Sequence, residues 1–196
     1  MTDTHPRFVL KQADGSFVGY VAYNESASVT NPTPTSPMAT AYTTPDAFRA
    51  FIKSAETLGK IPGLPKHARE VAVVTVGVYY ESVYEIYAHE TIANGEGITW
   101  RQLSYLKMGH KPPADGPDAL DEHCSVAFDV ANEMLRGSGS KGRLRDDVYN
   151  RAVELFGTEA TLGLIHYVGY YSWACLLMNG AGIGLPKGES IKPINL

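Results

Sequence analysis

The sequence predicts an all-α protein, a bundle of about seven helices that follows an extended N-terminal arm. From residue 44 onward, apolar residues recur at the three- and four-residue spacing of a helix face. Residues that start or end helices, mainly Thr, Pro, Gly and Asn, separate these stretches. The valine-rich residues 71–78 could suit a strand, but helical signals flank them on both sides. We therefore expect helices throughout residues 44–186.

Four helices are expected in the first half of this region, over residues 44–59, 65–79, 82–92 and 99–109. Thr44 can cap the first of them, Pro45 suits its first position, and Gly59 ends it. The third helix ends at Asn94-Gly95, and Thr99 caps the fourth.

Three further helices are expected over residues 117–136, 146–156 and 158–179. The last of them is apolar nearly all round, which is typical of a helix at the centre of a bundle or at a subunit interface. In the arm, residues 1–43, three prolines between residues 31 and 37 exclude regular structure. The expected organisation is this arm, a helical domain over residues 44–186 and a C-terminal tail over residues 187–196.

The composition excludes several classes of protein. The 196 residues are 44% hydrophobic and carry a formal net charge of -4, so they can bury a full core but lack the basic surface that nucleic acids require. The two cysteines, Cys124 and Cys175, form no C-x-x-C pair, which excludes a disulfide scaffold. Residues 1–10 do not resemble a signal peptide, and residues 161–178 are too short and polar to span a membrane. We expect a cytoplasmic protein that does not bind a membrane.

Glu85 and His89 are the side chains that point to chemistry. On a helix they lie four residues apart, so they meet on one face, and a carboxylate beside an imidazole can tune it for proton transfer. Glu70 lies among valines in the preceding helix, where an unpaired carboxylate would be costly, so it needs a partner such as this pair. The alternative is an ordinary surface Glu–His pair without a catalytic role.

Several motifs resemble the carboxymuconolactone decarboxylase family of the alkyl-hydroperoxidase-D-like superfamily. They are R-E-V-A-V-V at residues 69–74, Y-E-x-Y-A-H at residues 84–89, G-I-T at residues 97–99, and V-G-Y-Y at residues 168–171 followed by Asn179. The resemblance covers about residues 44–186. It implies an all-helical fold that assembles as a homo-oligomer, usually a trimer or hexamer, with the active site near the subunit contacts.

The thiol peroxidases of this superfamily carry the pattern E-x11-C-x2-C-x3-H. Aligned on His89, the pattern places its glutamate at Glu70 but its two cysteines at Ser82 and Glu85. A cysteine-based peroxidase mechanism is therefore rejected for this chain. The decarboxylase branch has a Glu followed four residues later by a His, as at Glu85 and His89, although Ile86-Tyr87 stand where that branch usually has a Trp.

This resemblance implies a cofactor-independent lyase that acts on a small cyclic lactone or keto acid through an acid/base pair. Catalysis is assigned to Glu85, His89 and Glu70, and substrate binding to residues of the same helix and of the last one: Ser82, Tyr84, Tyr87, His166 and Tyr170. The tyrosines could line a pocket or simply pack. The alternatives are a cofactor-free isomerase, dehydratase or cyclase of secondary metabolism, and a non-catalytic protein that binds a small ligand.

Neither a metal nor another cofactor is expected. Six histidines make metal binding worth weighing, and His123 or His166 could join Glu85 and His89 as ligands. However, the Glu85-x3-His89 spacing is neither the H-E-x-x-H of zinc proteases nor the Glu-x-x-His of di-iron bundles.

Overall fold

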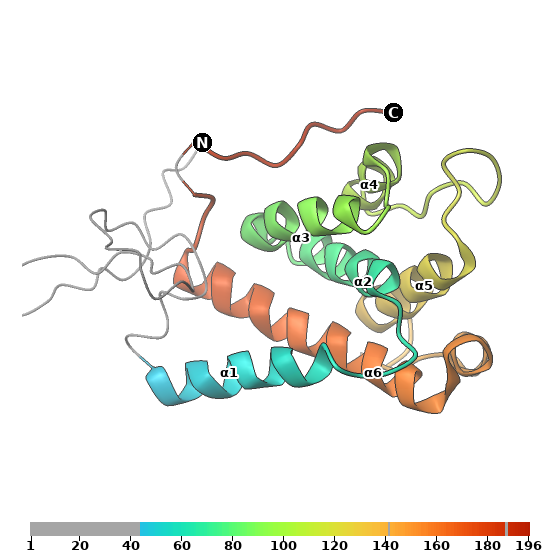
Figure 1. The fold of residues 1–196 in the computed structure, drawn as a ribbon, viewed down its shortest axis with the longest axis horizontal. Helices are drawn as coiled ribbons and strands as arrows, with labels where there is room; N and C mark the ends of the chain where they lie inside the picture. The colour runs from blue at the N-terminus through green and yellow to red at the C-terminus, as the bar shows by residue number, and fades with distance from the viewer. Residues whose placement is uncertain (1–43, 141, 187) are drawn as a thin grey trace, which may run out of the picture.

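The computed structural model describes residues 44–140, 142–186 and 188–196, and within them it contains α-helices and no β-strand (Figure 1). The all-α prediction is confirmed for this part of the chain, whereas the expected arm over residues 1–43 lies outside the described residues. The six helices are α1 (Pro45–Leu58), α2 (Lys66–Tyr79), α3 (Val83–Gly95), α4 (Trp100–Lys107), α5 (Glu122–Arg136) and α6 (Asp146–Ala181).

The predicted start of α5 at Pro117 is wrong. The helix begins at Glu122, because the side chain of Asp121 accepts a hydrogen bond from the backbone N–H of Cys124 and so caps the first turn. Asp118, which precedes this helix, is not helical and forms an ion pair with Arg101. Asp121 therefore marks the start of the helix more reliably than Pro117, which lies four residues earlier.

The two helices expected over residues 146–156 and 158–179 form one element, the 36-residue α6. The helical path is broken at Gly157, whose φ of 80° and ψ of 166° are not helical. This backbone conformation is essentially restricted to glycine. The predicted boundary between the two helices therefore corresponds to a kink at Gly157 within α6.

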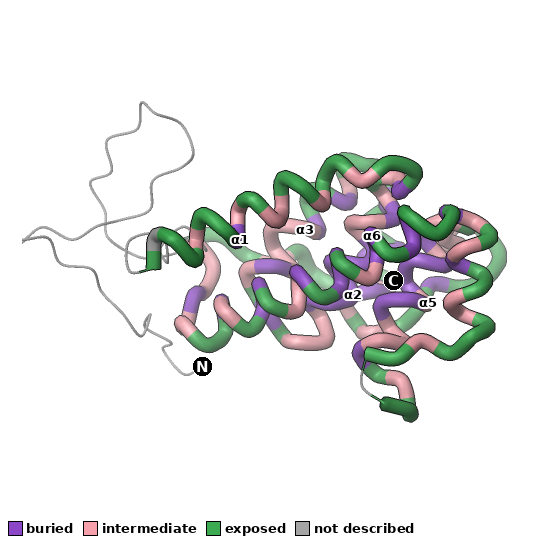
Figure 2. Tube along the Cα trace, turned by 90° about the horizontal axis from the view of Figure 1, so that it is seen from below, coloured by how far each residue is buried: buried purple, intermediate pink, exposed green. Residues whose placement is uncertain are grey.

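Helix α2 lies at the centre of the fold. It packs against α3, α4, α5 and α6, and Figure 2 shows buried residues concentrated where α2, α5 and α6 meet. The valines that would also suit a strand face neighbours on all sides, and Val71, Val73, Val74 and Val76 are at most 1% exposed. A helix surrounded in this way needs no polar face, which explains its strand-like composition.

Two segments flank this core. Helix α1 lies along α6 (Figure 1), where the ring of Phe51 stacks on that of Tyr170 with 4.7 Å between centroids. The C-terminal residues 188–196 run past α3 and α4 without helix, and the backbone N–H of Lys192 donates to Glu90 while that of Asn195 donates to Ser104. Within the described part of the chain, no helix has the length and apolar character needed to cross a membrane.

Candidate acid/base site

A tight turn between α2 and α3 brings the three predicted catalytic residues, Glu70, Glu85 and His89, close together. The turn contains Glu81, whose φ of 53° is in the left-handed region, and the backbone N–H of Ser82 donates back to Gly77. A non-glycine residue in this region is uncommon. Because the chain reverses here, α3 packs against α2, and His89 of α3 lies opposite Glu70 of α2.

His89 lies between two carboxylates. Its Nδ1 atom is 2.7 Å from Oε2 of Glu70, and its Nε2 atom is 3.4 Å from Oε2 of Glu85. The side chains of His89, Glu70 and Glu85 are 12%, 14% and 6% exposed, so this is a largely buried cluster, not a surface pair. The two glutamates contact opposite ring nitrogens, so the imidazole cannot share a single metal ion with both of them.

The electrostatics of the cluster favour protonated forms. Burial lowers the pKa of His89, but its hydrogen bond with Glu70 and the charges of Glu70 and Glu85 outweigh burial and raise the pKa above its usual value. Burial raises the pKa of Glu85, and the charge of Glu70 adds to this, while His89 opposes it. Both shifts favour the protonated forms of the Glu85 carboxyl and the His89 imidazole.

Aromatic rings from α6 close one side of the cluster. The Tyr171 ring meets the His89 ring edge-on with 4.8 Å between centroids, and it stacks on Tyr167 at 5.9 Å. The Tyr167 hydroxyl in turn accepts a hydrogen bond from Arg69, the residue before Glu70. Burial, followed by the charges of Glu70 and Glu85, raises the pKa of Tyr171, so this phenol stays neutral.

Ser82 is the N-cap residue of α3 and is fully buried. Its hydroxyl oxygen makes no hydrogen bond of ordinary geometry among the described residues, but it lies beside the Cys175 thiol. Burial dominates at Cys175 and raises its pKa to about 12, so the thiol is not activated. A buried polar atom without a partner is rare and marks a position where a ligand could supply one.

A pocket of about 610 Å³ lies between α1 and α6. Tyr170 and His166 line it together with Trp173 and Lys53. Tyr170 also lies close to the acid/base cluster, because its ring meets Tyr171 edge-on and the charge of Glu85, after burial, raises its pKa. Tyr170 therefore adjoins both the pocket and the buried carboxylate.

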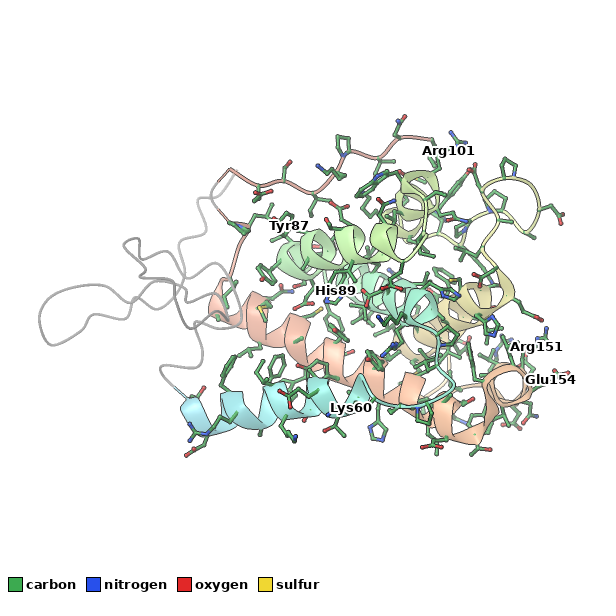
Figure 3. All side chains as sticks on the ribbon, viewed as in Figure 1. Lys60, Tyr87, His89, Arg101, Arg151 and Glu154 are labelled. Atoms are coloured by element: carbon green, nitrogen blue, oxygen red, sulfur yellow. The ribbon has the colours of Figure 1, made fainter. Side chains whose placement is uncertain are left out.

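The structure does not bring all the predicted residues together. Tyr87 and His89 point to opposite sides of α3 (Figure 3), because residues two apart on a helix differ by about 200°. Tyr87 instead lies close to Glu189 of the C-terminal tail, and its ring lies near that of Tyr84. Tyr171, which contacts His89 directly, was missing from the predicted site, although its neighbour Tyr170 was included.

No protein-family model matches the chain, and no curated protein is similar to it in sequence. The solved structures that have a similar fold include two crystal structures. One is a protein of unknown function from Agrobacterium tumefaciens, for which the antioxidant defence protein AhpD has been suggested as the identity. Its TM-score is 0.63 at 12% sequence identity, and the match covers 75% of this chain and 95% of that one. The chain has the AhpD-like fold.

The second structure with the AhpD-like fold is an uncharacterized peroxidase-related protein from Ralstonia eutropha, described as an alkylhydroperoxidase AhpD core. Its TM-score is 0.63 at 18% identity, and the match covers 76% of this chain and 75% of that one. At these identities the comparison shows the fold. A fold does not determine the chemistry, which depends on the side chains present, and this chain has serine and glutamate at positions 82 and 85 in place of cysteine.

Proposed function

We propose that the protein is a cofactor-independent acid/base enzyme, a lyase that removes CO2 from a small cyclic lactone or keto acid. The observation that carries this proposal is the buried imidazole of His89, held between the carboxylates of Glu70 and Glu85. Burying an imidazole together with two carboxylates is costly, because their charges lose the stabilisation that water provides. An active site uses such an arrangement to shift pKa values toward neutrality.

The reaction would proceed by proton transfer from His89. The bond between the carboxylate and the ring carbon breaks, CO2 leaves, and the electron pair remains on the substrate as a conjugated enolate. The imidazolium then gives its proton to that carbon, and solvent restores the proton. Glu70, hydrogen-bonded to Nδ1, orients the ring so that Nε2 faces Glu85 and the substrate.

The protonation states suit an anionic substrate. If both glutamates were charged beside an imidazolium, the cluster would carry a net negative charge and would repel the carboxylate of the substrate. The raised pKa of Glu85 favours its neutral form and so reduces this repulsion. The unpartnered hydroxyl of Ser82 and the first turn of α3 offer hydrogen-bond donors to the anion, and the helix dipole favours negative charge there.

The pocket beside Tyr170 is large enough for such a substrate. Its volume of about 610 Å³ falls in the ordinary range of ligand sites, roughly 300–1,000 Å³. Trp173 and Tyr170 provide flat apolar walls, and His166 lies at the same pocket. We propose that this pocket receives the body of a cyclic molecule while its carboxylate approaches the acid/base cluster.

The same site could run a related proton transfer without loss of CO2. In that case Glu85, whose pKa is raised toward neutrality, would remove a proton and His89 would return one to a different carbon. This chemistry corresponds to an isomerase, and its products have the mass of the substrate, so product analysis separates the two reactions.

We also propose that the protein acts as a homo-oligomer, a trimer or hexamer. Helix α6 exposes Leu162, Trp173 and Leu176, which are 47%, 44% and 58% accessible. Apolar side chains on one long helix favour contact with another subunit. Light scattering coupled to gel filtration would measure the mass, and a monomer would contradict this proposal.

Product analysis by NMR in deuterated water tests the function. The purified protein would be incubated with γ-carboxymuconolactone and a panel of lactone and β-keto acids. The expected result is CO2 loss with deuterium at the former carboxylate carbon. Deuterium exchange or rearrangement without CO2 loss would show an isomerase or cyclase instead. Ligand binding without turnover would indicate a binding protein.

Two variants assign the roles. His89→Gln should reduce turnover by about 100-fold or more, the usual contribution of a positioned acid or base, whereas the exposed His110→Gln should not. Ser82→Ala should raise KM, because the variant removes the hydroxyl proposed to bind the substrate anion. Full activity in His89→Gln would exclude the proposed mechanism.

A further inference from the structure

A second group of potential ligands lies where the N-terminal ends of α2 and α5 meet. His67 is in the first turn of α2, Asp121 is the N-cap residue of α5, and His123 is in the first turn of α5. One side-chain ligand atom from each residue lies within 4.8 Å of the others. Among the described residues, no other group of three histidine, cysteine or acidic side chains meets this criterion.

Neighbouring groups already hold these side chains in place. One carboxylate oxygen of Asp121, Oδ1, accepts from the backbone N–H of Cys124 at 2.8 Å. Its other oxygen, Oδ2, is thereby directed to Nε2 of His67 at 3.2 Å. The His123 ring packs against Phe156 at 5.5 Å and meets the His67 ring edge-on at 6.2 Å.

We propose that His67, Asp121 and His123 bind a divalent transition-metal ion, with Zn²⁺ as the best fit. Two imidazole nitrogens and one carboxylate oxygen form a donor set that zinc uses in proteins. Ligand atoms about 2.0–2.1 Å from a tetrahedral ion lie roughly 3.3 Å apart. The 3.2 Å between Nε2 of His67 and Oδ2 of Asp121 already matches this spacing. The ligand nitrogen of His123 lies within 4.8 Å of the ligand atoms of the other two residues.

The site is open enough for water to provide a fourth ligand, since the side chain of Asp121 is 53% exposed and that of His67 is 31% exposed. A bound ion would join the beginnings of α2 and α5, two helices that pack against each other along the core. This proposal does not depend on the proposed lyase function, because it uses none of the residues around His89.

The simpler interpretation is an ion pair between His67 and Asp121 alone. The two interpretations differ at His123, which the ion pair does not require and the metal site does. Asp121→Asn adds a second distinction, because asparagine caps a helix as well as aspartate does but lacks the charge that a zinc ligand supplies. This variant should therefore fold normally and bind the metal more weakly.

The test is a Zn²⁺ titration of the full chain by isothermal calorimetry after removal of metal with a chelator. We expect one Zn²⁺ per chain, and an affinity at least about 10-fold lower in His67→Ala, Asp121→Asn and His123→Ala. His110→Ala, at an exposed histidine outside the group, and His89→Gln, at the acid/base cluster, should bind as the unmodified protein does. In the unmodified chain Zn²⁺ should also raise the melting temperature.

Two results would overturn the proposal. One is the absence of saturable Zn²⁺ binding to the unmodified chain. The other is an unchanged affinity in His123→Ala, which would leave only the ion pair. Melting curves recorded with chelator present would show that each variant folds before its affinity is compared; if His67→Ala does not fold, His67→Gln replaces it.

Discussion

The Nδ1 atom of His89 donates a hydrogen bond of 2.7 Å to Glu70 across the α2–α3 turn, although the two residues are 19 positions apart. This contact fixes a proton on Nδ1, because a carboxylate can only accept there. It therefore leaves Nε2, the atom that faces Glu85, as the position where a proton can be gained or lost. The ring orientation follows from the packing of two helices.

The pKa of His89 should be above its usual value of about 6.5 in the unmodified protein and lower in Glu70→Gln. The variant keeps the hydrogen-bonding shape of residue 70 but removes the charge that stabilises the imidazolium. NMR titration of isotope-labelled histidine side chains measures this pKa directly. An unchanged pKa in the variant would show that Glu70 does not control the protonation of His89.

The stabilising effect of this contact should depend on pH in a defined direction. Because the folded-state pKa of His89 is raised, its contribution to stability is fully present below the unfolded value of about 6.5 and is lost as the pH rises through the folded pKa. The difference in free energy of unfolding between the unmodified protein and Glu70→Gln should therefore shrink between about pH 6 and alkaline pH. Urea titrations at several pH values measure it, and a difference that grows with pH would contradict the assignment.

Lys107→Met should destabilise the protein by about 3–5 kcal/mol. The side chains of Lys107 and Glu90 are 5% and 1% exposed, and their ion pair is 2.9 Å long, so the substitution leaves a buried carboxylate without its cation. Chemical unfolding provides the measurement.

Two matched variants support the interpretation of this ion pair. Adding Glu90→Leu to Lys107→Met should recover much of the loss, because no charge then remains buried. Lys111→Ala removes a more exposed pair with Asp129 and should cost no more than about 1 kcal/mol. Equal losses at Lys107 and Lys111 would show that burial of the first pair has little effect.

Gly157→Ala should destabilise the protein by about 1–3 kcal/mol through backbone strain alone. A Cβ atom at this position would meet nothing within 4 Å, so steric overlap cannot account for a loss, whereas the φ of 80° would be strained for alanine. Gly169→Ala, in the helical part of α6 and equally free of neighbours, should be neutral or stabilising by up to about 1 kcal/mol. Thermal unfolding of both variants provides the comparison, and similar results at the two positions would argue against strain at Gly157.

Much of the fold follows from local sequence signals. Capping residues and glycines placed the first four helices close to their observed bounds, and the four-residue spacing of Glu85 and His89 predicted their contact on one face of α3. The start of α5 was mistaken because Pro117 and Asp121 are both plausible helix starts, and only the hydrogen bond from Cys124 distinguishes them.

Contacts between helices were harder to predict, because a sequence pattern describes one helix at a time. Glu70 needed a partner, but only the packing of α3 on α2 shows that the partner is Nδ1 of His89. Nothing in the local pattern paired Glu90 with Lys107, and the tyrosines near the motif gave no sign that Tyr87 faces the C-terminal tail.

The sequence alone therefore determined the helical class, the absence of cysteines from positions 82 and 85, and the identity of the acid/base residues proposed here. The tertiary structure decided which ring nitrogen each glutamate contacts and that His67, Asp121 and His123 lie together. The physical reason is the distance along the chain over which each kind of interaction acts. Propensity, capping and helical spacing act within a few residues, whereas both of these sites are built across helices whose positions depend on how the whole core packs.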